Sequence, residues 1–135
     1  WDLRPYREGE GQHNGSMFNA LYEKIGALID DYEDDTPLII WERAHMRGGP
    51  STRLGMGWIS ATQMVADTFR CPIMDVHTGT LKKFATGDNK AGKNAMMDYA
   101  ETKLGRPPVD DNEADAVCCA YYGLENYVLP QVSDE

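Results

Sequence analysis

LIIWE, residues 38–42, is a short apolar run that ends in a carboxylate, Glu42. A continuous apolar run of this length is typical of a central strand that is buried on both faces. A second run of the same kind, PIMDVH at residues 72–77, follows later in the chain. Between the two, residues 52–69 carry apolar side chains at the 3.6-residue spacing of a helix. A helix between two strands predicts a parallel pair and an α/β fold.

Helical patterns also lie on both sides of this unit. Ser16 is a candidate N-cap, and apolar residues recur from Phe18 to Tyr32 at helical spacing. After the second strand, the pattern predicts a short helical segment around residues 81–84, a helix over 90–104 closed by Gly105, and a last helix over 112–127. Two strands alone do not form a stable covered sheet. We therefore expect further strands, either from residues 1–15 or from residues that precede Trp1.

The length and composition of the chain indicate one domain. The chain has 135 residues, of which 41% are hydrophobic and 26% are charged. No apolar stretch is long enough to span a membrane and the polar N-terminus is unlike a secretory signal, so we expect a cytoplasmic protein with no membrane partner. Two of the three cysteines are adjacent. This arrangement favours reduced thiols over a disulfide framework or a thiolate metal site.

The net charge of −9 argues against a protein that coats nucleic acid non-specifically, because such binding depends on cations that neutralise phosphates. The charge is uneven, however. Residues 82–106 hold six basic and three acidic side chains, a local net charge of +3, and Arg43, Arg47 and Arg53 form a second basic group. An acidic protein with one basic face can still bind a phosphate backbone.

VDDNEADAV, residues 109–117, places four carboxylates directly ahead of an apolar helical run. Asp110 and Glu113 have the spacing of a capping box at the start of a helix. Asp115 is different, because it lies four residues after Asp111 and beside the apolar stripe of the helix. Two like charges on one face repel each other, and burying either of them is costly unless a cation compensates. A divalent metal ion would remove this conflict.

Glu42 raises the same question, since a carboxylate at the C-terminal end of a central strand points into the crevice where α/β sheets bind ligands. The simpler alternative is a loop-facing glutamate paired with Arg43 or Arg47. Carboxylates without a His or Cys cluster suit Mg²⁺ or Mn²⁺ better than zinc. With basic groups nearby, they predict phosphoryl transfer by two metal ions about 4 Å apart.

Three segments in this order resemble a known family. IIWE (39–42) is similar to a strand that ends in a catalytic Glu, LKKFATGDNKAGK (81–93) to a "VK..vtG.g.a.K" segment, and DDNEADAV (110–117) to a closing "DAADAL". These are the motifs of the RuvC-type Holliday-junction resolvases of the ribonuclease H-like superfamily, especially the phage-encoded members. The resemblance covers about residues 16–125. It implies an α/β fold with a ribonuclease H-like mixed sheet flanked by helices.

The resemblance implies a metal-dependent endonuclease that resolves four-way DNA junctions as a homodimer. It makes Glu42 and Asp115 ligands of two Mg²⁺ or Mn²⁺ ions, and it matches Lys82 and Lys93 to lysines that support cleavage and contact the DNA backbone. Asn112 stands where the family has Asp, so the remaining ligand is Asp111 or Asn112. The full set of candidate catalytic or metal-binding residues is Glu42, Lys93, Asp111, Asn112 and Asp115. The candidate DNA-binding residues are Arg47, Lys82, Lys83, Lys90 and Lys93.

One family element has no counterpart here. The family begins with a strand that carries its first catalytic Asp, and no such segment precedes the first predicted helix. We therefore expect a chain that is truncated at its N-terminus and that alone binds metal weakly and does not cut DNA.

Two other functions are compatible with parts of the sequence. GDNKAGKN, residues 87–94, matches the phosphate-binding G-x-x-x-x-G-K pattern, but it follows a lysine-rich segment instead of an apolar strand, and Asn94 replaces the Ser or Thr that would hold Mg²⁺. An NTPase is therefore disfavoured. The stronger alternative is a non-catalytic ribonuclease H-like domain that binds branched DNA or a protein partner.

Overall fold

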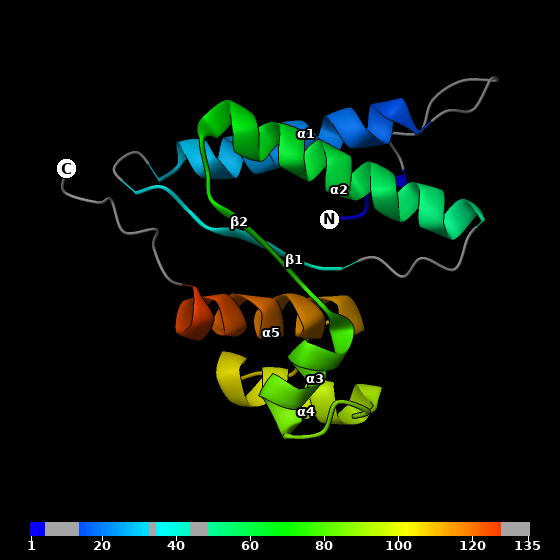
Figure 1. Cartoon of the computed structure of the whole chain (residues 1–135), viewed down its shortest axis with the longest axis vertical. Coiled ribbons are helices and arrows are strands. Elements are labelled where there is room, and N and C mark those ends of the chain that lie inside the picture. The colour runs from blue at the N-terminus through cyan, green and yellow to red at the C-terminus, as the bar shows by residue number, and fades with distance from the viewer. Residues whose placement is uncertain (5–13, 33–34, 44–48, 128–135) are drawn as a thin grey trace, which may run out of the picture. The chain divides into compact units, whose positions relative to one another are not determined.

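The computed structural model describes residues 1–4, 14–32, 35–43 and 49–127 (Figure 1). Their secondary structure, in chain order, is α1 (Gly15–Asp30), β1 (Ile39–Glu42), α2 (Pro50–Phe69), β2 (Ile73–Val76), α3 (Thr78–Thr86), α4 (Lys93–Leu104) and α5 (Asp111–Asn126). Among these helices, none has both the length and the apolar character that crossing a membrane requires.

The predicted order of elements is confirmed, with differences at the helix starts. Helix α2 begins at Pro50 and not at residue 52, and α4 begins at Lys93 and not at residue 90. Helix α1 has Asn14 at its N-cap position, with no side-chain cap, so the prediction of Ser16 as N-cap is wrong. Helix α3 is longer than the predicted segment and begins at Thr78. It begins there because the Nδ1 atom of His77 accepts a hydrogen bond from the backbone N–H of Gly79, at 3.1 Å. Histidine is outside the usual set of N-cap residues, so the sequence pattern did not indicate this start.

The two strands form a parallel pair, as predicted. The N–H of Ile39 donates to the carbonyl of Pro72 at 3.0 Å, and the N–H of Arg43 donates to the carbonyl of Val76 at 2.7 Å. The offset between partners is the same in both bonds, which fixes a parallel register. Within the described residues the sheet has these two strands, so the expected mixed sheet is not seen there. Residues 1–4 contain no strand, and residues 5–13 lie outside the described part.

The chain divides into two compact units. The first comprises Trp1–Ile39 and Ala44–Ile73 and contains helices α1 and α2, which lie side by side (Figure 1). The ring of Phe18 packs edge-on against Trp58, with ring centroids 4.9 Å apart. A Cβ atom added to Gly57 would lie 2.1 Å from the Phe18 ring, so the helices approach closely at this glycine. The Phe18 and Trp58 rings thus pack where Gly57 leaves room, beside an apolar cluster that includes Met17 and Ala20.

The second unit comprises Ile40–Arg43 and Met74–Glu135 and contains α3, α4 and α5. Its core includes the buried side chains of Val76, Leu81, Met96 and Cys118. Burial raises the pKa of the Cys118 thiol to about 11. The described cysteines are free thiols in the structure, in line with the prediction.

Helices α4 and α5 run in the same direction. At their first residues, Lys93 Nζ lies 3.1 Å from an Asp111 carboxylate oxygen. Ten residues further along both helices, Lys103 Nζ lies 4.8 Å from the centroid of the Tyr121 ring. The two helices therefore start at the same end of the unit, and residues 105–110 return the chain from the end of α4 to the start of α5.

Candidate active site

A pocket of about 160 Å³ lies in the second unit, where β1 ends and where α3, α4 and α5 begin. Its lining residues are Glu42, Thr78, Leu81, Lys82, Lys93, Met96, Asp111 and Asp115. Three of these are carboxylates and two are lysines, and they come from four separate elements of the chain. All five charged residues were singled out by the sequence. The structure thus places Glu42 and Asp115 at one pocket.

Glu42 is the last residue of β1 and is partly buried. The Thr78 hydroxyl donates a hydrogen bond to its Oε1 atom. The adjacent Arg43 instead pairs with Asp75 on β2, through two contacts of 3.1 and 3.2 Å. The alternative in which Arg43 neutralises Glu42 is therefore wrong, and Arg47 lies outside the described residues. Glu42 brings a carboxylate to the pocket with a neutral hydroxyl as its partner.

Asp111 and Asp115 project from the first two turns of α5 and have opposite pKa shifts. The ammonium of Lys93 lowers the pKa of Asp111 by hydrogen bonding and by its charge. The pKa of Asp115 is raised to about 6, first because burial disfavours the charged form and then because of the charges of Glu42 and Asp111. The positive charges of Lys82 and Lys93 only partly oppose this shift. The repulsion between carboxylates that the sequence predicted is therefore present.

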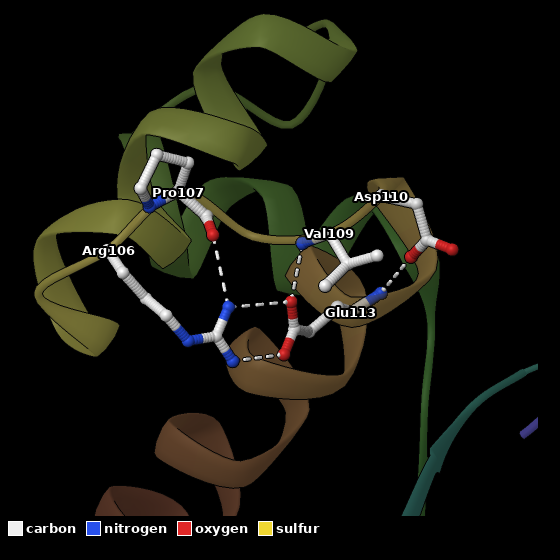
Figure 2. A network of polar contacts seen from close by, with 5 residues as sticks. All are labelled: Arg106, Pro107, Val109, Asp110 and Glu113. Atoms are coloured by element: carbon white, nitrogen blue, oxygen red, sulfur yellow. Dashed lines mark hydrogen bonds and ion pairs between the residues drawn. The ribbon is translucent and has the colours of Figure 1, made fainter.

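The start of α5 is held by the network shown in Figure 2. The N–H of Glu113 donates to Asp110 Oδ1 at 2.8 Å, and the Glu113 carboxylate accepts from the N–H of Val109 at 2.6 Å. Arg106 donates to both oxygens of that carboxylate, at 2.6 and 3.2 Å, and lowers the pKa of Glu113 to about 2. The predicted capping box is confirmed, except that Glu113 reaches the N–H of Val109 and not that of Asp110. These two acids secure the helix that carries Asp111 and Asp115.

The other predicted site residues lie outside the pocket lining. Asn112 is exposed and is not among the lining residues, so of the two alternatives it is Asp111 that faces the pocket. Lys83 is exposed in the last turn of α3. Lys90 is exposed in the loop that follows, where its N–H donates to Asp88 Oδ1 at 2.9 Å. Arg47 lies outside the described residues.

The loop at residues 87–92 also bears on the NTPase alternative. Helix α3 ends at Thr86, immediately before Gly87. A P-loop follows a strand, so this segment lacks the structural context of that motif.

Thr78 is the polar lining residue that the sequence analysis missed. It comes two residues after the end of β2, as Glu42 ends β1. The carboxyl ends of neighbouring parallel strands meet at the same edge of a sheet, which is where ligands bind in α/β folds. Applied to both strands, this rule would have pointed to Thr78.

Three helices begin at the pocket. Thr78, Lys93 and Asp111 are the first residues of α3, α4 and α5, and all three line it. The N-terminus of a helix carries a partial positive charge and unpaired backbone N–H groups. Three such ends offset part of the carboxylate charge and favour an anionic group such as phosphate.

The three pocket carboxylates are chemically suitable ligands for a hard divalent cation, because carboxylate oxygens bind Mg²⁺ and Mn²⁺. In the described part of the chain, however, no three or more Asp, Glu, His or Cys side chains are grouped so that they could hold a metal ion. Glu42, Asp111 and Asp115 therefore share a pocket without converging on one point. Because Asp111 is paired with Lys93, a bound cation would compete with this lysine.

A larger hollow of about 540 Å³ lies in the first unit. Its described lining includes Asp30 and Asp35 but no Lys or Arg. Without a basic group it does not suit a phosphate. The smaller pocket of the second unit is therefore the candidate active site.

Comparisons with known proteins bear on the fold. No protein-family model and no curated protein matches the sequence. Among solved structures, the chain is similar to RuvC from Thermus thermophilus, with a TM-score of 0.68 at 13% identity, over 87% of this chain and 74% of that one. It is also similar to T. thermophilus RuvC in complex with a Holliday junction substrate, with a TM-score of 0.66 at 14% identity, over 85% of this chain and 70% of that one. The chain therefore has a RuvC-like fold.

Proposed function

We propose that this site hydrolyses phosphodiester bonds in branched DNA with the help of divalent metal ions, so that the protein is an endonuclease of the Holliday-junction-resolving type. One observation carries the proposal. Three carboxylates and two lysines from separate segments line a single pocket at the ends of the strands and the starts of three helices. The RuvC-like fold supports it.

The carboxylates and the lysines have different roles in this proposal. Glu42, Asp111 and Asp115 hold the metal ions, two Mg²⁺ or Mn²⁺. When bound, such ions activate water for attack on a phosphodiester and stabilise the charge that develops on it. Lys82 and Lys93 bind non-bridging oxygens of the scissile phosphate, and Lys93 also contributes electrostatic stabilisation during cleavage. Burial and the neighbouring carboxylates raise the pKa of Asp115 to about 6, and a bound cation would favour its carboxylate form.

The proposed substrate is a four-way junction. One of the similar structures is RuvC bound to a Holliday junction, and that likeness supports the same substrate class for this chain. The proposed contacts to the phosphate backbone are Lys83, which is exposed on α3, Lys90, which is exposed in the following loop, and Arg47. We further propose that the protein is a cytoplasmic homodimer in which each copy cuts one strand. Light scattering would measure the mass of the dimer.

The test is junction cleavage by the chain together with any residues that its gene encodes before Trp1. We expect Mg²⁺- or Mn²⁺-dependent nicking of a four-way junction and little cutting of a linear duplex of the same sequence. Glu42→Gln removes a ligand charge and should lower cleavage by on the order of 10³-fold, since lost metal stabilisation is worth several kcal/mol. A chain that cuts equally well with Gln at position 42, or with a metal chelator present, contradicts the proposal.

The non-catalytic alternative has one observation in its favour, the lack of a ready-made group of metal ligands among the described residues. A non-catalytic domain would bind the junction with an affinity that does not depend on metal, and it would leave the DNA intact. Gel-shift titrations in the presence and absence of Mn²⁺, run beside the cleavage assay, separate the two functions.

A further inference from the structure

We infer that Thr78 is a positioning residue that orients the Glu42 carboxylate for its role at the pocket. This inference rests on the proposed function, since it assigns to Thr78 the task of preparing a metal ligand. It begins from a single contact, the hydrogen bond that the Thr78 hydroxyl donates to Glu42 Oε1.

The contact joins two segments through the geometry of the parallel strands. The N–H of Arg43 donates to the carbonyl of Val76, which brings the ends of β1 and β2 level. Glu42 ends the first strand, and Thr78 follows the second after a single residue, His77. The hydroxyl of Thr78 therefore reaches the Glu42 side chain across the ends of the two strands.

The donor is itself held on a well-fixed frame. His77 caps α3 by accepting from the N–H of Gly79, and its carbonyl accepts from the N–H of Leu81 at 3.1 Å. The Leu81 side chain is buried in the core of this unit. The first turn of α3 is thus fixed by a side-chain cap, a backbone bond and a buried anchor, and Thr78 lies within this turn.

A hydroxyl is suited to this task in a way that a basic partner is not. Arg43, beside Glu42, would neutralise the carboxylate, but it is paired with Asp75. Thr78 has no formal charge, so its hydrogen bond orients Glu42 and leaves the negative charge in place for a cation. A carboxylate has about four lone-pair sites, and one hydroxyl occupies only one of them.

Thr78→Val and Thr78→Ser separate the hydroxyl from the shape of the side chain. Valine keeps the volume and removes the donor, whereas serine keeps the donor. Thr102→Val is the matched control, because the Thr102 hydroxyl donates within α4, to the carbonyl of Asp98 at 3.0 Å, and Thr102 does not line the pocket.

Two measurements on each variant test the inference. The first is the Mn²⁺ affinity, by electron paramagnetic resonance and without DNA, of the chain together with any residues that its gene encodes before Trp1, which is the unaltered chain of the comparisons below. Loss of an outer-shell partner lowers metal affinity by roughly 10- to 100-fold, so we expect at least a tenfold loss in Thr78→Val, with near-normal affinity in Thr78→Ser and Thr102→Val. The second is the NMR order parameter of the Glu42 side chain without metal, which should fall in Thr78→Val alone.

The outcomes distinguish this inference from the proposed function. If the unaltered chain binds Mn²⁺ and cuts junctions, and Thr78→Val matches it in affinity and in Glu42 order, Thr78 has no positioning role. If Glu42 loses order in Thr78→Val while the unaltered chain has no affinity for Mn²⁺, the proposed function fails and the assigned task fails with it. If a loss of affinity in Thr78→Val is equalled in Thr78→Ser, the hydroxyl is not the cause and the inference is overturned.

Discussion

Each of the two units has its own apolar core, but they differ in the charges that accompany it. In the first, α1 and α2 meet through shape, with the Phe18 and Trp58 rings packed where Gly57 leaves room. In the second, α3, α4 and α5 share an apolar core but also bring like charges to one pocket, which raises the pKa of Asp115 to about 6. The first unit is built without a comparable conflict among its described residues. The second retains one, which is typical of a site where charge serves binding or catalysis.

Gly57→Ala tests the dependence of the first unit on shape and should have the largest effect on stability. In an exposed helix, alanine would be favoured over glycine by up to about 1 kcal/mol. Here its Cβ would lie 2.1 Å from the Phe18 ring, so the ring must move off its packing position. Overpacking of this kind destabilises by roughly 1–3 kcal/mol. We expect a net loss of stability in urea denaturation.

Metal binding is the control for this variant. Mn²⁺ affinity measured under conditions where the Gly57→Ala chain is folded should match that of the unaltered chain, because the pocket belongs to the other unit. A stabilised Gly57→Ala variant would mean that the helices do not approach as closely as described.

Asp115→Asn tests the charge conflict of the second unit, and it should stabilise the metal-free protein. The pKa of Asp115 is about 6 in the folded chain and 3.8 as the reference value for the unfolded chain. Between these values the folded state holds more protons than the unfolded state, so Asp115 lowers stability as the pH rises from about 4 to above 6. The penalty is absent below pH 4 and complete above pH 7.

Because Asp115 is only partly buried, solvent screening reduces this penalty to about 1 kcal/mol. The gain from Asp115→Asn should therefore be near zero at pH 4 and reach that value at pH 8, in urea denaturation without metal. If Asp115→Asn and the unaltered chain are equally stable at pH 8, the charged Asp115 carboxylate does not destabilise the folded chain. The same variant should lose Mn²⁺ affinity, so stability and metal binding move in opposite directions.

Lys93→Gln should have the smallest effect on stability. The Lys93–Asp111 pair is exposed, with 82% and 45% of the side-chain surfaces accessible, and exposed pairs contribute roughly 0.2–1 kcal/mol. Its effect on DNA binding should be clearer. Loss of one phosphate contact should weaken junction binding and lower the slope of log affinity against log salt by about one.

Lys24→Gln makes the same change of charge in the first unit and serves as the matched control. Its salt slope should equal that of the unaltered chain. If both variants lower the slope equally, binding depends on overall charge and the pocket has no special part in it.

Much of the fold was predictable because it depends on local patterns. The apolar runs at residues 38–42 and 72–77, with a helical period between them, correctly predicted the parallel pair. Gly105 closes α4 in the left-handed conformation with a φ of 72°, as expected of a glycine at that position. The spacing of Asp110 and Glu113 likewise predicted the cap that the structure contains.

The site was less predictable, because it depends on the direction in which each side chain points from its helix and on contacts between distant segments. The choice between Asp111 and Asn112 could not be made from the sequence, since neighbouring helical residues point about 100° apart and the first residue of α5 was uncertain by one. The contact between Thr78 and Glu42 joins residues 36 positions apart and leaves no periodic signal. The contact depends on the register of the two strands.

That register also determines the sign of the charge at the pocket. Glu42 and Arg43 are consecutive, and side chains of consecutive strand residues point to opposite faces. A slip of one residue between β1 and β2 would place the base where the acid now lies and reverse the charge that this strand end brings to the pocket. The double contact of Arg43 with Asp75 holds that base on its own side of the strand pair. The charge that the end of β1 brings to the pocket therefore depends on one register, in which the N–H of Arg43 donates to the carbonyl of Val76.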